Sequence, residues 1–485
     1  MAKSKSKSQK SLLKRLKAAF AGMEVCEKVN LSGAYRLKNK KIEVPLRSYP
    51  IQLTLGQNVD APLHLYPEWL INDDGEGETS DHYILFDPQR YFSEIAGFCR
   101  LDDGDKITLG DRHNSECDFV DCGDCDRGCR LSIRNEEGHL TFKDHNSTEG
   151  ACISPLVDEK KINKLIKWRR GKLNRLKDIY GGPIKPLSDG DALKLIEQVN
   201  ELQLEENSRP RNRKDLPGGV VKLAKGVTPI IVGDLHTKLD NLLVILSQNH
   251  FLESLEDGSA ALILLGDAVH SEEAGQYDKM KSSMLIMDFI FKLKIRFPEN
   301  VFYIRGNHDS FSEEIGKQGV PQGLLWEKTL LKQRGKAYHK AMQRLYDLLP
   351  YVVHSKYFAA CHAAPPTSSP DYEKLINITD HPDLIEELYN NRLEKPNRPS
   401  GYNKRDIKKF RKCLGLESDT PVIVGHTPLS LDETLWEDVN NIENHYVVYG
   451  AGDEWIGVIT QVRGEIVPLR YPTEPLMGYI DTLDD

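Results

Sequence analysis

The sequence predicts an α/β domain that follows an all-β sandwich domain. From Val220 to about Leu469, apolar segments of strand length alternate with amphipathic helical segments, which is typical of α/β domains. Residues 25–155 instead hold short alternating segments, such as 51–55 and 140–143, separated by Gly, Asp and Asn. This spacing is typical of a β-sandwich. A chain of 485 residues also exceeds the usual size of one hydrophobic core, so we expect at least two domains.

Changes in composition along the chain predict five segments. They are a basic tail (1–24), the β-sandwich domain (25–155), a basic helical linker (156–185), the α/β domain (186–475) and a C-terminal tail (476–485). The linker is rich in Lys and Arg and ends near a Gly-Gly-Pro sequence. A new helix is predicted to begin at Ser188, with Asp191 as its capping partner three residues later.

The composition indicates a soluble protein of a reducing compartment, and we expect a cytoplasmic location. Apolar residues make up 39% and charged residues 28%, and neither a run of eighteen apolar residues nor a signal-peptide pattern is present. Nine cysteines, an odd number, argue against a full set of disulfides. A net charge of −8 makes nucleic acid an unfavourable partner. Residues 1–20, with seven Lys or Arg and no acid, form either a solvated tail or a contact with an anionic surface.

Five motifs of the α/β domain each place an acid, a histidine or an asparagine after an apolar strand. They are IIVGDLHTKLDN, LILLGDAVH, FYIRGNHDS, YFAACHAAPP and VIVGHTP. The side chains that they offer are Asp234, His236, Asp267, Asn307, His308, His362 and His426. Strand ends are where ligands gather in α/β sheets, and converging carboxylates and imidazoles need cations to neutralise them. The mixture of oxygen and nitrogen ligands suits Mn, Fe, Zn or Mg.

The motifs GDLH, GDAV, GNHD, CHAAP and GHTP resemble those of the calcineurin-like metallophosphoesterases, and most of all the PPP branch of the protein serine/threonine phosphatases. The resemblance implies a central β-sandwich flanked by helices, with two divalent metal ions, of which Mn is the first choice. The metal ligands that it implies are Asp234 and His236 for one ion, Asn307, His362 and His426 for the other, and Asp267 as the bridge. A bridging hydroxide would attack phosphorus, and His308 would protonate the leaving group.

Part of the family pattern is altered. The usual GDxVDRG motif has an Asp and an Arg where this chain has His270 and Ser271, so a phosphate-binding charge is lost. Two interpretations follow. Either His270 acts in catalysis as a cation that partly replaces the Arg, or the substrate is not an ordinary phosphoserine protein. A second phosphate-binding Arg is usual in the family, and Arg398, 28 residues before His426, is the candidate, together with Asn307.

The segments RLDDGDKITLGDRHNSECDFV and LSIRNEEGHLTFKDHNSTEGACIS resemble a forkhead-associated (FHA) domain, a fold that binds phosphothreonine peptides. Ser147, Thr148 and Gly150 match its phosphate-binding loop, but Glu149 stands where an Asn is expected and Arg112 comes one residue late. A carboxylate beside a phosphate site repels the ligand. We therefore expect the FHA-like fold, with a protein partner, rather than phosphopeptide binding.

A cysteine-rich segment lies inside the FHA-like region. Its four thiols are Cys117, Cys122, Cys125 and Cys129. Four thiolates can close a tetrahedral structural metal site, although this group is unusually compact for zinc. The alternative is a redox-labile surface insertion.

The function that these features predict is that of a phosphoprotein phosphatase of the Ser/Thr type. One alternative is the hydrolysis of nucleotide polyphosphates or other small phosphoesters, because GNHD also occurs in the similar bacterial dinucleoside-tetraphosphate hydrolases. A second is a catalytically weak scaffold or binding protein, because the family Asp-Arg pair is missing.

Overall fold

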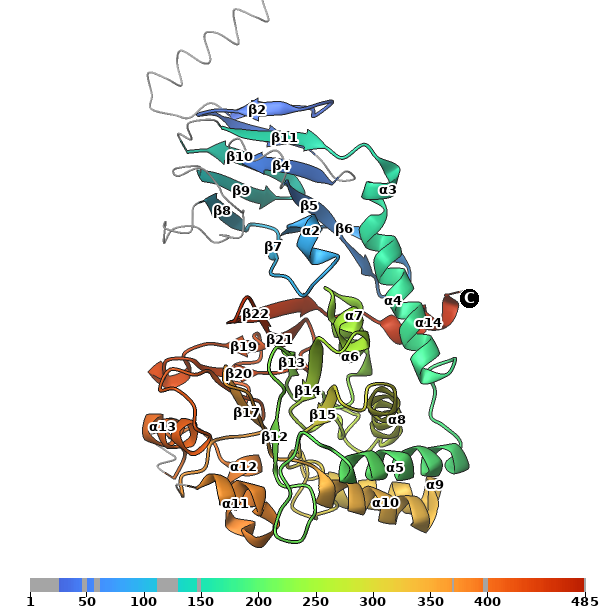
Figure 1. The fold of residues 1–485 in the computed structure, drawn as a ribbon. Coiled ribbons are helices and arrows are strands. Elements are labelled where there is room, and N and C mark those ends of the chain that lie inside the picture. Colours follow the sequence, from blue (N-terminus) through green and yellow to red (C-terminus); the bar gives the residue numbers. More distant parts are fainter. Residues whose placement is uncertain are drawn as a thin grey trace, which may run out of the picture. The chain divides into compact units, whose positions relative to one another are not determined.

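The structure is a computed structural model of the chain, and it describes residues 26–45, 50–55, 62–110, 130–145, 150–368, 370–395 and 400–483. The chain divides into two compact units (Figure 1). The first comprises Met1–Asn72 and Glu76–Trp168, and the second comprises Asp73–Gly75 and Arg169–Asp485.

The first unit contains two β-sheets. One has the strand order β1-β3-β10-β9-β8 and the other the order β2-β11-β4-β5-β6-β7. The strands of the first sheet are β1 (Cys26–Lys28), β3 (Lys41–Val44), β10 (His139–Asp144), β9 (Arg130–Glu136) and β8 (Lys106–Gly110). Those of the second are β2 (Tyr35–Leu37), β11 (Ala151–Pro155), β4 (Ile51–Leu55), β5 (Leu63–Ile71), β6 (Gly77–Phe86) and β7 (Cys99–Leu101). All pairs are antiparallel except β1 and β3.

Alternate residues of both sheets share one hydrophobic core. Ile51 and Leu53 of β4 and Leu140 and Phe142 of β10 are all fully buried in it. Because side chains alternate between the faces of a strand, this pattern packs the two sheets face to face. The predicted all-β region is therefore confirmed as a β-sandwich.

Several sequence predictions for this unit fall outside the described residues. They concern Arg112, Cys117, Cys122, Cys125, Cys129, Ser147, Thr148 and Glu149. Neither phosphopeptide binding nor a cysteine metal site is therefore tested, and both stay predictions.

The described residues between Pro88 and Tyr180 include three helices. They are α2 (Pro88–Tyr91), α3 (Glu159–Ile162) and α4 (Lys164–Tyr180). The first five residues of α4 belong to the first unit and the remainder belongs to the second. Within the described part of the chain, no helix combines the length and the apolar character that crossing a bilayer requires.

The second unit also contains two sheets. Their strand orders are β12-β16-β17-β18-β20-β19 and β15-β14-β13-β21-β22. The first sheet is made of β12 (Val220–Lys222), β16 (Val352–His354), β17 (Ala359–Cys361), β18 (Val422–Val424), β20 (His445–Val448) and β19 (Leu435–Trp436). The second is made of β15 (Val301–Tyr303), β14 (Ala260–Leu264), β13 (Thr228–Val232), β21 (Trp455–Val462) and β22 (Glu465–Pro472). β13, β14 and β15 are parallel, and β17, β18 and β20 are parallel.

Apolar side chains from both sheets form one core between them. Ile231 and Ile263 of the second sheet and Ala360 and Ile423 of the first belong to this core, and all are buried. The helices lie outside the two sheets, so the unit is an α/β sandwich as predicted (Figure 1). Figure 1 places α11 (Tyr372–Ile376), α12 (Pro382–Asn390) and α13 (Lys404–Cys413) on the outer side of the first sheet, where their apolar side chains share a core with β17 and β18. α6 (Leu239–Ser247), α7 (Phe251–Glu256) and α8 (Lys281–Arg296) pack on the second.

The helices of this unit have the following bounds. They are α5 (Asp189–Leu204), α6 (Leu239–Ser247), α7 (Phe251–Glu256), α8 (Lys281–Arg296), α9 (Gln322–Gln333), α10 (Gly335–Leu348), α11 (Tyr372–Ile376), α12 (Pro382–Asn390), α13 (Lys404–Cys413) and α14 (Leu476–Thr482), with 3-10 turns at Ile378–Asp380 and Val439–Asn441. The predicted start of α5 is confirmed, because the Ser188 hydroxyl accepts a hydrogen bond from the Asp191 backbone N–H.

Candidate metal centre

The five motifs meet at one rim of the α/β sandwich. Asp234 and His236 follow β13, Asp267 follows β14, and Asn307 follows β15. His362 comes directly after β17, and His426 comes two residues after β18. These strands run parallel within each sheet, so their carboxyl ends lie at the same edge. Residues separated by up to 192 positions are thereby brought into contact.

The side chains at this rim form two groups that share one carboxylate. Asp234, His236 and Asp267 offer ligand atoms that all lie within 4.8 Å of one another. Asp267, His362 and His426 form a second such group. All five side chains are buried.

Asn307 joins the second group through His362. Its Oδ1 lies 3.1 Å from Nε2 of His362, which is in turn 3.3 Å from Oδ2 of Asp267. The structure therefore brings together all six side chains that the sequence predicted as ligands.

Hydrogen bonds fix which imidazole nitrogen faces the centre. Nδ1 of His236 lies 3.0 Å from the His270 carbonyl oxygen, and Nδ1 of His362 lies 2.6 Å from that of Leu265. Each Nδ1–H therefore donates to a backbone carbonyl, which leaves Nε2 as the ring nitrogen that faces the centre and could bind a cation. Nε2 of His426 is buried and has no hydrogen-bond partner among the described residues. A buried polar atom without a partner is costly, and a metal ion would satisfy it.

The pKa shifts of two groups at the centre indicate that it lacks positive charge. Burial, reinforced by Asp267 and opposed by His362, raises the pKa of Asp234 to about 6. Burial works against a proton on His362, but the carboxylates of Asp267 and Asp234 outweigh it and raise the pKa of that imidazole to about 9. In the protein alone, a proton on His362 thus balances part of the carboxylate charge. Divalent cations would take over this neutralising role.

Two glycines leave room for the carboxylates. A Cβ atom on Gly425 would overlap Oδ1 of Asp234, and one on Gly306 would overlap Oδ1 of Asp267. The backbone N–H groups of His426 and His308 donate hydrogen bonds to Asp234 and Asp267, at 3.0 and 2.7 Å. The carboxylates are therefore held in place before any ion binds.

The backbone of the ligand loops is strained. His236, Asp267 and His426 have φ angles of 40°, 49° and 64°, in the left-handed region that side chains other than glycine rarely adopt. Such strain is typical of functional sites, where the surrounding structure imposes it. The donor set, its buried charge and this geometry all fit divalent metal ions.

His308 and His270 form a pair beside this centre. Their Nδ1 atoms are 3.1 Å apart. His270 is completely buried, and burial together with His308 holds its pKa well below the usual range. A charged imidazole without a carboxylate partner is unfavourable in such a place, so the burial of His270 does not favour its role as a cation replacing the family Arg, which stays a prediction. Its ring contacts the ring of His308.

Asp309 stabilises the loop that carries Asn307 and His308. Its carboxylate is buried and accepts hydrogen bonds from the Tyr303 hydroxyl at 2.7 Å and from the Gly306 N–H at 2.8 Å. Burial and the nearby Asp267 raise the pKa of Asp309 to about 7. The acid of the GNHD motif is thus turned into the protein rather than toward a substrate.

An arginine that sequence reasoning missed lies next to the last ligand. The predicted Arg398 is outside the described residues. Arg392, after α12, donates from Nη1 to the Thr427 hydroxyl at 3.1 Å. Burial, then His362 and then the Arg392 charge hold the pKa of the adjacent His426 well below its usual range. Only the fold reveals that Arg392 contacts the GHTP motif.

A second missed feature is an ion pair beside His236. Nζ of Lys317 lies 2.6 Å from Oε1 of Glu272, and the same oxygen lies 3.8 Å from Nε2 of His236. The hydroxyl of Tyr449 donates to the other oxygen of Glu272 at 3.1 Å. This Lys317–Glu272 ion pair lies close to the place where the family Arg is missing. No sequence signal connects Lys317 with the motifs, because it lies in a hairpin turn 45 residues after Glu272.

Comparison with known protein families identifies the domain. Residues 228–456 match the family model described as calcineurin-like phosphoesterase, and all six predicted ligands fall within that range. Residues 228–456 form a calcineurin-like metallophosphoesterase domain. The protein is a metal-dependent phosphoesterase. No curated protein matches the chain at the level of sequence.

Among solved structures, two phosphatases show a weak similarity to the chain. A protein serine/threonine phosphatase from Saccharomyces cerevisiae, described as similar to human phosphatase PP5, is 15% identical, with a TM-score of 0.43 over 59% of this chain and 90% of that one. A cold-active protein-tyrosine phosphatase from a psychrophilic Shewanella species is 10% identical, with a TM-score of 0.35 over 56% of this chain and 84% of that one. The identification of the domain depends on the family match and on the geometry of the ligands.

Replacing Gly425 by alanine should weaken metal binding, because the added methyl group would displace the Asp234 carboxylate. We expect the Gly425→Ala variant to bind Mn²⁺ at least about tenfold more weakly, the size of effect that lost support around metal ligands usually has. Isothermal titration and the Mn²⁺-dependent rise in melting temperature would measure it. Gly190→Ala, where a Cβ meets open space, is the control and should bind like the wild type. Equal affinities in all three proteins would contradict the role of the glycine.

Proposed function

We propose that the phosphoesterase domain is a binuclear-metal enzyme that hydrolyses phosphomonoesters and that its substrates are proteins phosphorylated on Ser or Thr. The observation that carries the proposal is the pair of ligand groups sharing Asp267. Asp234 and His236 would hold one ion, and Asn307, His362 and His426 the other, with Mn²⁺ as the first choice and Fe, Zn or Mg as alternatives. When bound, two such ions supply Lewis acidity toward a phosphoryl group and an activated water as nucleophile.

His308 is placed to deliver a proton to the leaving oxygen. The Asp267 carboxylate accepts a hydrogen bond from its backbone N–H, which ties the residue to the metal centre. Because Nδ1 of the ring faces His270, Nε2 is the nitrogen left for the substrate. In this proposal the neutral His270 sets the orientation of the ring and does not touch the substrate. It takes the position of the family Asp without providing a negative charge.

The phosphoryl oxygens would contact polar side chains from three loops. Arg392 approaches through Thr427, next to His426. Lys317 lies near His236, because the Glu272 carboxylate is close to both side chains. The side-chain amide of Asn307 lies beside His362, and in this proposal it also contacts the phosphate of the substrate. Charge-assisted contacts of this kind are what binding of a dianionic phosphate requires.

The β-sandwich unit has a separate role in this proposal. An FHA-like module joined to a phosphatase would bring the enzyme to a protein partner without taking part in hydrolysis. The proposed catalytic domain extends over residues 186–475, and the FHA-like module over residues 25–155.

A substrate panel tests the proposed reaction. The full-length protein with Mn²⁺ should release phosphate from phosphoserine and phosphothreonine peptides faster than from phosphotyrosine peptides or a dinucleoside tetraphosphate, and Asp267→Asn should abolish turnover. Preferred cleavage of the dinucleoside tetraphosphate would overturn the choice of substrate in favour of a nucleotide hydrolase. Metal binding without turnover of any substrate would identify a scaffold.

Loss of the proton donor should matter most for substrates with poor leaving groups. We expect His308→Asn to lower kcat on a phosphoserine peptide by about 10²- to 10⁴-fold, the usual contribution of general acid catalysis. Its effect on p-nitrophenyl phosphate should be much smaller, because nitrophenolate leaves without protonation. Steady-state kinetics on both substrates, with metal content measured on the same samples, would test this. Equal losses on both substrates would argue that His308 does not protonate the leaving group.

Removing the arginine beside His426 should weaken phosphate binding. Arg392→Ala is expected to lower kcat/KM by roughly 10- to 100-fold, since a hydrogen bond to a charged group contributes about 1.5–3 kcal/mol. The matched control is Arg405→Ala, an exposed arginine at the start of α13. Competitive inhibition by inorganic phosphate, measured alongside kcat/KM, should weaken only in the Arg392 variant. If both variants behaved like the wild type, Arg392 would have no part in the site.

A further inference from the structure

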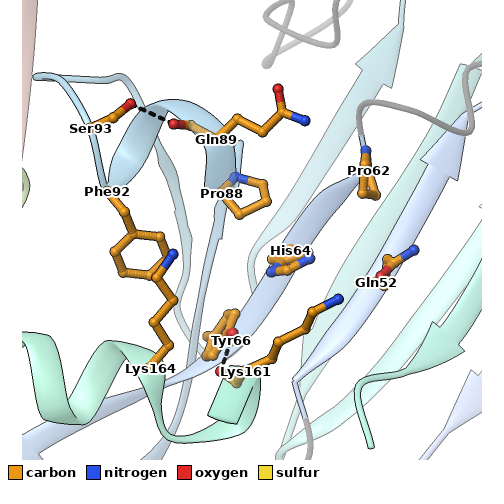
Figure 2. A pocket seen from close by; sticks show the side chains of 10 residues that line it. All are labelled: Gln52, Pro62, His64, Tyr66, Pro88, Gln89, Phe92, Ser93, Lys161 and Lys164. Atoms are coloured by element: carbon orange, nitrogen blue, oxygen red, sulfur yellow. Dashed lines mark hydrogen bonds between the residues drawn. The ribbon is translucent and has the colours of Figure 1, made fainter. Parts of the chain in front are cut away.

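The β-sandwich unit contains a pocket that the phosphoesterase reaction does not use. Its volume is about 570 Å³, a size typical of small-molecule sites. Figure 2 shows that it lies between β5, which carries His64 and Tyr66, and the helices α2 and α3. The lining residues all belong to the first unit, and none of them is a residue of the FHA resemblance.

Packed aromatic rings make one wall of the pocket rigid. The ring of Tyr66 stacks on Phe86 with centroids 5.4 Å apart, and Phe86 stacks in turn on Tyr91. The Tyr66 hydroxyl donates a hydrogen bond of 2.6 Å to the Lys161 carbonyl oxygen, which attaches α3 to this wall. Phe92 adds a further apolar surface. The pocket therefore exists before a ligand binds.

The polar side of the pocket is positively charged. Lys161 extends toward His64 and Gln52, and the Lys164 ammonium group lies 3.9 Å from the centroid of the Phe92 ring (Figure 2). Neither ammonium group forms an ion pair with a described residue, and no described lining residue is acidic. Two cations without a counter-charge in one pocket favour an anionic ligand.

His64 provides the second, independent sign of a ligand. The residue is only 7% exposed, and its Nδ1 is buried without a hydrogen-bond partner among the described residues. Figure 2 shows the ring inside the pocket, between Pro88 and Lys161. A buried ring nitrogen is costly to leave unpaired, and a neutral imidazole can donate from Nδ1 to an anion.

We propose that this pocket binds a small organic phosphate monoester that carries a flat, apolar group. The phosphate would accept hydrogen bonds from Lys161, Lys164 and His64, and the flat group would lie against Tyr66 and Phe92. A phosphate suits the pocket better than a carboxylate because three possible donors line it, and a phosphate offers three acceptor oxygens with up to two negative charges. The binding site is separate in sequence from the metal centre and does not depend on the proposed reaction.

The acid–base state of His64 supplies a direct readout of the ligand. Burial and then the charges of Lys161 and Lys164 lower the pKa of His64 to about 4. These two lysines are the charged residues among the described lining of the pocket. The other polar neighbours of His64 are neutral: Gln52 from β4, Gln89 from α2, and the Tyr66 hydroxyl, which donates to a carbonyl oxygen. A bound dianion favours the protonated imidazole, so the pKa of His64 should rise when the ligand binds.

Titration of adenosine monophosphate into the full chain tests the proposal. The Asp267→Asn variant should be used, because it prevents metal-dependent binding and turnover at the phosphoesterase centre. We expect one equivalent to bind at least about tenfold more tightly than adenosine, and the double variant Lys161→Ala/Lys164→Ala to lose about tenfold or more in affinity. Lys160→Ala, an exposed neighbour on α3 that does not line the pocket, is the matched control and should change nothing.

The remaining outcomes decide against the assignment. No binding at millimolar concentration, or binding that neither lysine substitution affects, would overturn the site. Tighter binding of a phosphothreonine peptide than of the nucleotide would overturn the choice of a small molecule. Imidazole resonances of His64 that keep the same pKa with and without adenosine monophosphate would exclude contact between the phosphate and this ring, whatever the lysine variants show.

Discussion

The organisation of the phosphoesterase domain depends on two buried carboxylates that share one small space. Asp234 and Asp267 both lie within the set of histidines at the rim of the sandwich. Negative charges removed from water are unfavourable by several kcal/mol each unless positive charge compensates them. In the protein alone, a proton on His362 offsets part of this charge, whereas paired cations would neutralise both carboxylates. The strained loops, the two glycines and the hydrogen bonds to both carboxylates all maintain this unfavourable arrangement.

The surroundings of the centre differ from the pattern of the family more than the ligands do. The acid–arginine pair of the usual motif is replaced by a neutral histidine in contact with His308 and by charges from other parts of the chain. Lys317 reaches the side of His236, and Arg392 reaches the side of His426. In the proposed function, polar contacts to a phosphate thus come from loops outside the ligand motifs.

The convergence of the candidate ligands was predictable from the sequence because each one lies shortly after a strand, and parallel strands end at the same edge. The α/β sandwich and the all-β unit were predictable for a similar reason, since alternation and strand spacing are local patterns. Arg392 and Lys317 were not predictable, because their positions are set by how long loops fold back on the sheet. The burial of His270 was not predictable either, because no local pattern in the sequence reveals it. The pocket around His64 combines strands and helices about 100 residues apart, and only the packed structure brings them together.

The most direct test of this account is anomalous X-ray diffraction from crystals of the full-length protein grown with Mn²⁺. Data recorded on both sides of the manganese edge should show two peaks per chain, about 3.5–4 Å apart, as in two-metal phosphoesterase sites. One peak should lie beside Asp234 and His236, the other beside His362 and His426, with the Asp267 carboxylate between them. A single peak, or peaks away from these side chains, would contradict the claim that the buried carboxylates are there to hold two cations.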